Sequence, residues 1–463
     1  QVLATGSTYY VDPYYHLDQS VYASYYRRDA VNSNQWNCGA GGDDLDLQSD
    51  PYFDNEQSNP TTEATTGTTL RTYRLALAAT GGYTAFHGGT VLGAQAALAT
   101  LVNRLTGVYE TDLTIRLQLV ANNNNLIYTN AATDPYTYEA VGSAGMLIEN
   151  QANIDGVIGS ANYDIGHVVD RITGGGDGIA SLGVVGSNGS KARGVTGFDN
   201  PVGDPFSIDF VAHEMGHQFG ANHTYNSNSN PFVGGQRNPN TAFEPGSGST
   251  IMSYAGITGT NSDLQPNSDA YFHFVSADEI LALMDGARFG VGTRTATGNS
   301  VPIANAGSNF TIPTGTPFVL TGSGTDANGD TLTYSWEQRD LGAAQLLNAP
   351  DNGASPLFRS FNPTLNPLRM FPKLNTVLSG QTFDNAGERL PTLARAMDFR
   401  LTVRDNRAGG GSNVDDVIVN VVSTGAAFSI TNLNSGTSLT GGSSQAITWN
   451  VAGTTGGGIN TAN

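Results

Sequence analysis

The stretch HEMGHQFGANH, residues 213–223, decides how this chain is interpreted, and it holds three of the seven histidines. Residues four apart lie on one face of a helix, so His213 and His217 can present two imidazoles to one metal ion. Gly220 lets the backbone leave the helix and turn, which brings back His223 as a third ligand. Three protein ligands leave one position open for water, the arrangement of catalytic rather than structural zinc. The stretch therefore predicts a zinc site.

Glu214 follows the first of these histidines and is predicted to act as the base for the water. The alternative is that a short HExxH pattern arises by chance in a helix of no special function. The longer pattern fixes five positions, and its chance occurrence is well below about one in a thousand. We therefore interpret the run as a functional zinc site.

A second motif, GSTIMSY at residues 248–254, follows the first. A long zinc motif followed by a turn with methionine resembles the metzincin clan of metallopeptidases, and in particular the bacterial secreted reprolysin-like family. In that clan a methionine underlies the zinc site, and Met252 is the matching position. Tyr254 matches a tyrosine that in some metzincins binds zinc or steadies the transition state. The alternative for Tyr254 is a half-buried aromatic side chain without a catalytic role.

Composition restricts the environment and the partners of the chain. The net charge is −19 over 463 residues, and a chain without a basic patch is not suited to nucleic acid or anionic membranes. No apolar run approaches the roughly twenty residues that span a bilayer. Charged residues make up only 13%, and Gly, Ser, Thr and Asn are abundant, as is typical of extracellular proteins rich in β-structure and turns. We expect a secreted protein whose partners are polypeptide substrates.

Cys38 is the only cysteine, so no intrachain disulfide is possible. Many metzincins carry an inhibitory cysteine upstream of the catalytic motif, and Cys38 is expected to bind zinc in a latent state. The alternative is a buried, inert thiol. Residues 1–68 are expected to be the tail of a pro-segment with this cysteine, ending in a polar linker over 41–68 that an activating protease would cut.

Residues 69–297 are expected to form the peptidase domain. Alternation predicts strands at 71–79, 113–120, 165–169 and 180–185, and helical periodicity predicts helices at 90–105, 144–158, 207–219 and 276–288. Ser207 or Asp209 is expected to cap the zinc helix, and Ser276 with Glu279 the last helix. The order resembles the metzincin α/β fold, a twisted mixed sheet plus long helices, as does KARGVTG at 191–197. The strand at 180–185 is expected to hold an extended substrate by main-chain bonds.

Residues 298–424 change to short alternating strands broken by Gly, Asn and Pro, which predict a β-sandwich. They resemble the polycystic-kidney-type immunoglobulin-like modules of secreted bacterial proteins, with Trp336 expected in the core. Asp326, Asn328 and Asp330 alternate as oxygen ligands of Ca²⁺ do, although we favour the alternative that they form an Asx-rich hairpin turn. Residues 425–463 are expected to begin a further β-module that is truncated, because so short a piece does not make a sandwich by itself.

Other titratable residues have several interpretations. His167 and His273 are expected to be packed or hydrogen-bonded histidines rather than ligands. The carboxylates of Asp204, Asp209 and Glu244 could orient the ligating imidazoles, and spacing does not select among them.

The predicted function is a secreted zinc endopeptidase in which Glu214 and Tyr254 assist attack by zinc-activated water, present here as a Cys-latched zymogen. The alternative is an extracellular structural or adhesive protein that carries a latent or repurposed metzincin domain. In either case the β-modules are expected to contact cell-surface or matrix components.

Overall fold

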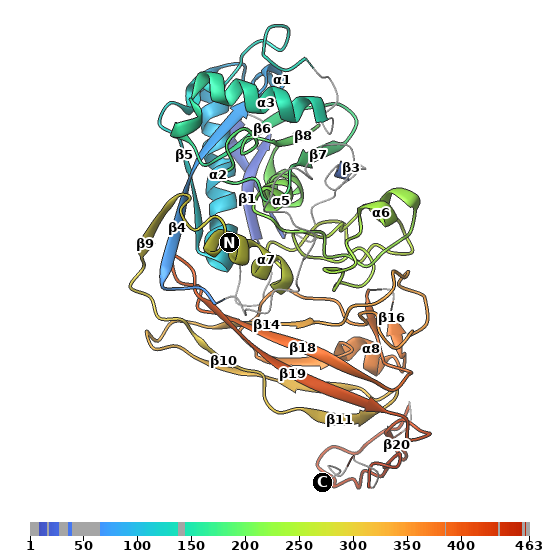
Figure 1. Ribbon diagram of the computed structural model, residues 1–463. Helices are drawn as coiled ribbons and strands as arrows, with labels where there is room; N and C mark the ends of the chain where they lie inside the picture. The colour runs from blue at the N-terminus through green and yellow to red at the C-terminus, as the bar shows by residue number, and fades with distance from the viewer. Residues whose placement is uncertain are drawn as a thin grey trace.

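The computed structural model describes residues 9–15, 18–26, 36–38, 65–137, 144–384, 386–433, 436–455 and 459. An α/β part, residues 69–297, stands above a β-rich part, residues 298–424, in Figure 1. Among the described residues, no helix is both long and apolar enough to cross a bilayer.

The α/β part is built on a seven-stranded mixed sheet. Its order is β3 (Trp36–Cys38), β7 (Gly176–Ala180), β8 (Gly194–Phe198), β6 (Ile165–Arg171), β4 (Thr69–Ala79) and β5 (Ile115–Leu119), and β9 (Thr293–Ala296) also pairs with β4. Strands β8, β6, β4 and β5 are parallel neighbours, whereas β7 runs antiparallel to β8 and β9 antiparallel to β4. The apolar β4 is buried over its C-terminal half because both of its faces are covered.

Helices cover both faces of this sheet. Tyr73, Leu75 and Leu77 of β4 pack into one apolar cluster with the long helix α2 and the zinc-motif helix. Ala76 and Ala78 face the opposite way, into a second cluster with α3. The helical elements of this part are α1 (Gly81–Phe86), α2 (Val91–Leu113), η3 (Asn123–Leu126), α3 (Ala144–Val157), η4 (Ser160–Asn162), α4 (Gly203–Phe206), η5 (Ser207–Ala212), α5 (His213–Gln218), α6 (Pro231–Gln236) and α7 (Phe274–Asp285).

Three local predictions in this part are wrong. The zinc-motif helix begins at Gly203 rather than Ser207 and is one run of α4, the π-helical η5 and α5, with no side-chain cap at Val202. The last helix begins at Phe274, with His273 rather than Ser276 as its N-cap. The strand predicted at 180–185 is β7, Gly176–Ala180, and the chain turns directly after it. Glycines at 176 and 178 hid this strand, because they carry no apolar side chain to alternate.

The β-rich part centres on a four-stranded sheet, β11-β19-β18-β14, with small two-stranded sheets beside it. Trp336, 3% exposed, lies in its apolar core as expected. Its elements are β10 (Ile303–Asn305), β11 (Phe310–Pro313), β12 (Phe318–Thr321), β13 (Ser323–Thr325), β14 (Thr333–Gln338), β15 (Leu368–Phe371), α8 (Leu374–Leu378), β16 (Phe383–Asp384), β17 (Glu388–Arg389), β18 (Arg395–Arg404) and β19 (Ser412–Val422).

The two ends of the chain form small hairpins. At the N-terminal end β1 (Tyr9–Tyr15) pairs antiparallel with β2 (Asp18–Tyr26), and the Tyr10 hydroxyl donates to Asp204 of the α/β part. At the C-terminal end β20 (Ser429–Ile430) pairs with β21 (Trp449–Asn450), whose residues are exposed.

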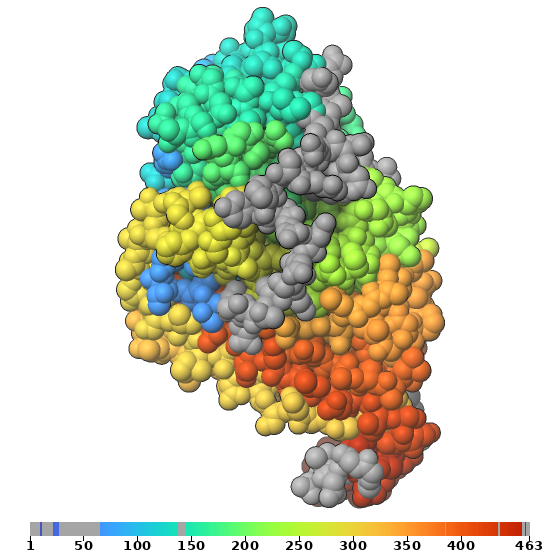
Figure 2. All heavy atoms as spheres, viewed as in Figure 1, coloured from blue at the N-terminus to red at the C-terminus, as the bar shows by residue number. Residues whose placement is uncertain are grey.

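The α/β and β-rich parts share a buried polar junction. The Arg404 guanidinium lies 2.7 Å from the Asp112 carboxylate, and the Arg400 guanidinium 3.0 Å from that of Asp278, with all four side chains at most 6% exposed. Thr66, just before β4, exchanges backbone hydrogen bonds with Ser412 at the start of β19. Figure 2 shows lime residues of the α/β part lying directly against orange residues of the β-rich part. Buried charges need such partners, so the junction is a built interface rather than a flexible tether.

Candidate metal centre

The three motif histidines meet at one point. The Nε2 atom of His217 lies 3.1 Å from the Nε2 atoms of both His213 and His223, and these last two lie 3.3 Å apart. All three side chains are buried, at 4% exposure or less. Helix α5 supplies His213 and His217 one turn apart, and the irregular chain after it supplies His223. The predicted ligand set is therefore brought together.

Each imidazole is oriented by a backbone carbonyl. The Nδ1 atoms of His213, His217 and His223 each lie 2.7 Å from a carbonyl oxygen, that of Ile251, Ala221 and Gln236 respectively. A carbonyl only accepts, so each Nδ1 carries the proton and each Nε2 presents its lone pair to the common point.

The residues present fit a zinc ion. Nitrogens that bind one zinc at about 2.0–2.1 Å in tetrahedral directions lie about 3.3–3.4 Å from each other. The observed separations of 3.1 to 3.3 Å are close to this value. Burial lowers the pKa of His217 to about 4. Burial, followed by the neighbouring histidines, lowers the pKa of His213 and of His223 well below the ordinary value. The imidazoles are thus neutral at pH 7, the form that binds metal.

Glu214 lies between α5 and the edge of the sheet. Its side chain is fully buried, and a Cβ atom on Gly178 of β7 would overlap its carboxylate. Only glycine at 178 leaves room for the carboxylate to approach the backbone of β7 so closely. The predicted base therefore sits beside both the histidine triad and β7.

The turn that contains Met252 lies against both segments that carry the candidate ligands. The Met252 sulfur occupies the space that a side chain at Gly216 would fill, between His213 and His217 on α5. The preceding carbonyl, that of Ile251, accepts from His213, and the Met252 carbonyl accepts from the backbone N–H of Thr224 at 3.1 Å. The turn thus contacts the segments of the first and third ligands.

Gly220 and Tyr254 shape the surroundings of His223. Gly220 has φ of +104°, a conformation that glycine adopts readily, and the chain leaves the helix there as predicted. Tyr254 is fully buried, with its ring centroid 4.6 Å from that of His223 and 5.9 Å from that of His213. It stacks on Tyr225 at 4.4 Å. The tyrosine that the motif singled out is therefore a neighbour of the ligands.

The backbone of Cys38 lies at the same sheet edge. Cys38 ends β3, which pairs in parallel with β7 and places Cys38 in register with Gly178. The thiol itself lies outside the described residues, as does the linker up to residue 64.

The hydrogen bonds and ion pairs described for the three candidate carboxylates go to groups other than the imidazoles. Asp204 pairs with Arg104 at 2.7 Å, and Asp209 accepts from the backbone of Ser268. Glu244 acts at one remove from the ligands: its carboxylate accepts from the Thr224 and Thr250 hydroxyls, each at 2.6 Å. Backbone carbonyls orient the imidazoles instead. Every residue has a backbone carbonyl, so the sequence does not indicate which ones take this role.

His167 and His273 are buried histidines with polar partners outside the triad, as expected. His167 bonds Gln218 and Thr196 through its two ring nitrogens, each at 2.9 Å. His273 lies in the junction, with its Nε2 atom 3.7 Å from the Glu337 carboxylate. Burial lowers the pKa of His167 to about 4 and that of His273 to about 3, so both are neutral.

One supporting residue was missed from the sequence. Glu279 was expected to cap its own helix, but its carboxylate accepts from the backbone N–H and the side-chain amide of Asn222, at 2.9 and 2.7 Å. Asn222 directly precedes His223. No periodicity signals a bond between α7 and a loop 57 positions earlier.

A group of three carboxylates that could hold a cation lies in the β-rich part. Carboxylate oxygens of Asp326, Asp330 and Asp405 lie within 4.8 Å of one another. Arg407 pairs with Asp330 at 3.2 Å, and Asn328 accepts from the backbone of Ser300 instead of joining the group. Calcium therefore stays a prediction, with a ligand set in which Asp405 stands in place of the expected Asn328.

Comparison with known proteins agrees with this geometry. Residues 69–281 match the family model described as metallo-peptidase family M12B, reprolysin-like. Together with the histidine triad, the match supports a zinc metallopeptidase domain over that span. No curated protein matches the chain. Among solved structures, a nucleoside hydrolase-related hypothetical protein from Saccharophagus degradans is 20% identical, with 32% of this chain and 31% of that chain covered and a TM-score of 0.16. So low a score carries no argument about fold or function.

Proposed function

We propose that this chain is a secreted zinc-dependent endopeptidase with Glu214 as its general base. The observation that carries the proposal is the histidine triad, in which the three Nε2 atoms converge while the three Nδ1 atoms point at carbonyls. The nearby Glu214 supports the chemistry. The small fraction of charged residues in a Gly- and Asn-rich chain supports secretion.

The chemistry divides between the metal and the side chains. A bound zinc ion supplies Lewis acidity, which polarises a peptide carbonyl and lowers the pKa of water. Glu214 takes a proton from the attacking water and returns it to the leaving amine. Tyr254, beside His223, donates a hydrogen bond to the charge that develops on the carbonyl oxygen.

Strand β7 is the proposed platform for the substrate. It pairs with β8 on one side and with β3 on the other, so this second side becomes a free edge if β3 leaves; Gly178 on it lies against Glu214. An extended polypeptide that adds to this edge would gain main-chain hydrogen bonds and place a peptide bond next to the base. In the structure β3 pairs with this side of β7, and we propose that the segment that carries Cys38 thereby takes the place of a substrate.

This arrangement supports latency. We propose that the Cys38 thiolate binds the zinc ion and keeps out water, because a tethered ligand acts at a high effective concentration. Cleavage within residues 41–68 then releases β3 and opens the edge of β7.

The residues after 297 are proposed to be an immunoglobulin-like sandwich followed by a further β-module that contacts surface or matrix components. The four-stranded sheet with a packed Trp336 supports the sandwich.

The test is hydrolysis of casein by the zinc-loaded chain before and after a cut within 41–68. We expect activity after the cut, its loss with a chelator, and its return with zinc. The uncut Cys38→Ser variant should be active, because a neutral hydroxyl binds zinc far more weakly than a thiolate. Zinc-loaded, cut protein that cleaves no peptide would favour a structural or adhesive role. Equal activity before and after the cut would remove the latency.

A further inference from the structure

The third ligand depends on a chain segment with little regular structure. His223 lies five residues after α5, and the carbonyl that orients its Nδ1 atom belongs to Gln236, the last residue of the short helix α6. The Tyr225 hydroxyl bonds the Val233 carbonyl at 2.7 Å, which ties α6 to the same segment. Any movement of α6 therefore changes the direction in which His223 points.

Arg237, which directly follows α6, anchors this helix to the β-rich part. Arg237 donates from Nε to the Asn226 side-chain oxygen at 2.9 Å and from Nη2 to the carbonyl of Gly342 at 2.7 Å. Asn226 is fully buried and donates from its amide to the carbonyl of Ala343 at 3.1 Å. The backbone N–H of Gln345 donates to the Asn226 carbonyl at 3.1 Å. Four hydrogen bonds thus join 226, 237 and 342–345 into one brace.

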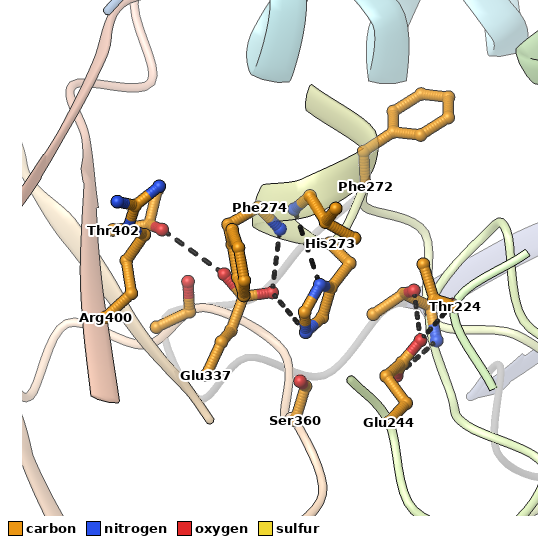
Figure 3. Close-up of polar contacts among 12 residues, drawn as sticks. Thr224, Glu244, Phe272, His273, Phe274, Glu337, Ser360, Arg400 and Thr402 are labelled. Atoms are coloured by element: carbon orange, nitrogen blue, oxygen red, sulfur yellow. Dashed lines mark hydrogen bonds and ion pairs between the residues drawn. The ribbon is translucent and has the colours of Figure 1, made fainter. Parts of the chain in front are cut away.

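The rest of the junction holds this brace in place. Figure 3 shows His273 and Glu337 pointing toward one another, and Glu244 pointing toward Thr224, the residue after His223. Ser249, bonded to Glu244 through its backbone, also donates to the carbonyl of Ser360 in the β-rich part at 3.3 Å. Contacts from the β-rich part therefore reach both the methionine turn and the loop of the third ligand.

We propose that the 342–345 segment of the β-rich part positions the third zinc ligand, with Asn226 and Arg237 as the positioning residues. The β-rich part is then an integral support of the metal site, although the family model ends at residue 281. This inference rests on the zinc site of the proposed function, but not on what the site hydrolyses. Indirect supports of this kind usually contribute about tenfold to a hundredfold in metal affinity.

The test is zinc affinity by chelator competition in the full chain, together with the visible absorption of the Co²⁺-substituted protein. Asn226→Ala and Arg237→Gln should each weaken zinc binding by about tenfold and shift the cobalt bands, because His223 is no longer held in one direction. The double variant should lose no more than the larger single loss, since both residues act through one brace. Because Arg237 is half-buried, Arg237→Gln should disturb the fold less than Asn226→Ala. Its zinc affinity therefore tests the inference even if Asn226→Ala does not fold.

Glu110→Ala is the matched control. Glu110 also crosses the junction, accepting from the backbone N–H of Gly409 at 2.8 Å, but no described contact joins it to the ligand loop. Zinc affinity in this control should stay within about twofold of the wild type. Wild-type affinity and cobalt spectra in the Asn226 and Arg237 variants would overturn the inference, as would an equal loss in the control. Zinc binding without peptide hydrolysis would refute the proposed activity alone.

Discussion

The candidate metal centre draws its histidines from a helix and from an irregular segment of the chain. His213 and His217 belong to α5, where main-chain hydrogen bonds of the helix set their spacing. His223 belongs to an irregular segment, where side chains set its position: Glu279 holds Asn222 on one side and Glu244 holds Thr224 on the other. The helix sets the spacing of its two histidines through its own main chain, whereas the position of the loop depends on anchors from α7, from the methionine turn and from the β-rich part. Substitutions can test this difference.

The largest effect is expected for a helix-borne ligand. His217→Ala removes one of three ligands and leaves a pair that binds zinc weakly, so affinity should fall by more than about a thousandfold and activity should vanish. Chelator competition and metal analysis after dialysis give the result. Stoichiometric zinc in this variant would place the ligands elsewhere.

Glu214→Ala changes the same helix without removing a ligand. Zinc should stay bound, while the rate of hydrolysis by the cut enzyme should fall by about a hundredfold to ten-thousandfold, the range that a general base supplies. The measurement is kcat/KM beside zinc content. Undiminished hydrolysis would assign the base to another group.

Glu279→Ala tests the loop side. It removes both hydrogen bonds to Asn222, so zinc affinity should fall by about tenfold while α5 keeps its two ligands. The control is Glu149→Ala on α3, whose carboxylate bonds Thr137 far along the sequence from the ligand loop. If both variants bind zinc like the wild type, the loop needs no anchor from α7.

The smallest effect is expected for the pH dependence of thermal stability, through Glu337 in the junction. Burial raises the pKa of Glu337 from 4.5 to about 8, although Arg404 acts in the opposite direction. A carboxyl whose pKa is raised by folding contributes stability that is fully present below its unfolded value and lost as pH rises through the folded one. Glu337→Gln has no charge to bury, so its Tm should fall less than that of the wild type between pH 5 and 8. Metal-free samples keep the zinc ligands out of the comparison, and parallel Tm profiles would contradict the expectation.

The same contrast explains what the sequence could predict. The ligands, Glu214 and Met252 follow from fixed spacing on a helix and a turn, and the strand patterns located β4, β5 and β6 closely. Residues that act across the fold, such as Glu279 on Asn222 or Arg237 on Gly342, join positions up to 105 apart and show no local signal. The start of the zinc-motif helix was misplaced because α4 begins after Val202, whose apolar side chain makes no capping hydrogen bond that could mark it. Strand β7 was misplaced because Gly176 and Gly178 give no apolar alternation; they leave room for Phe210 and Glu214, respectively.

The pairing of Thr66 with Ser412 also bears on how the protein is made. These two residues are 346 positions apart, and the Asp112–Arg404 ion pair spans 292. Contacts of such long range form slowly, and in a chain synthesised from its N-terminus they cannot form before the later residue has left the ribosome. The segment that leads into β4 therefore lacks this partner until residue 412 has been synthesised, so a shorter polypeptide cannot form this contact between the two parts.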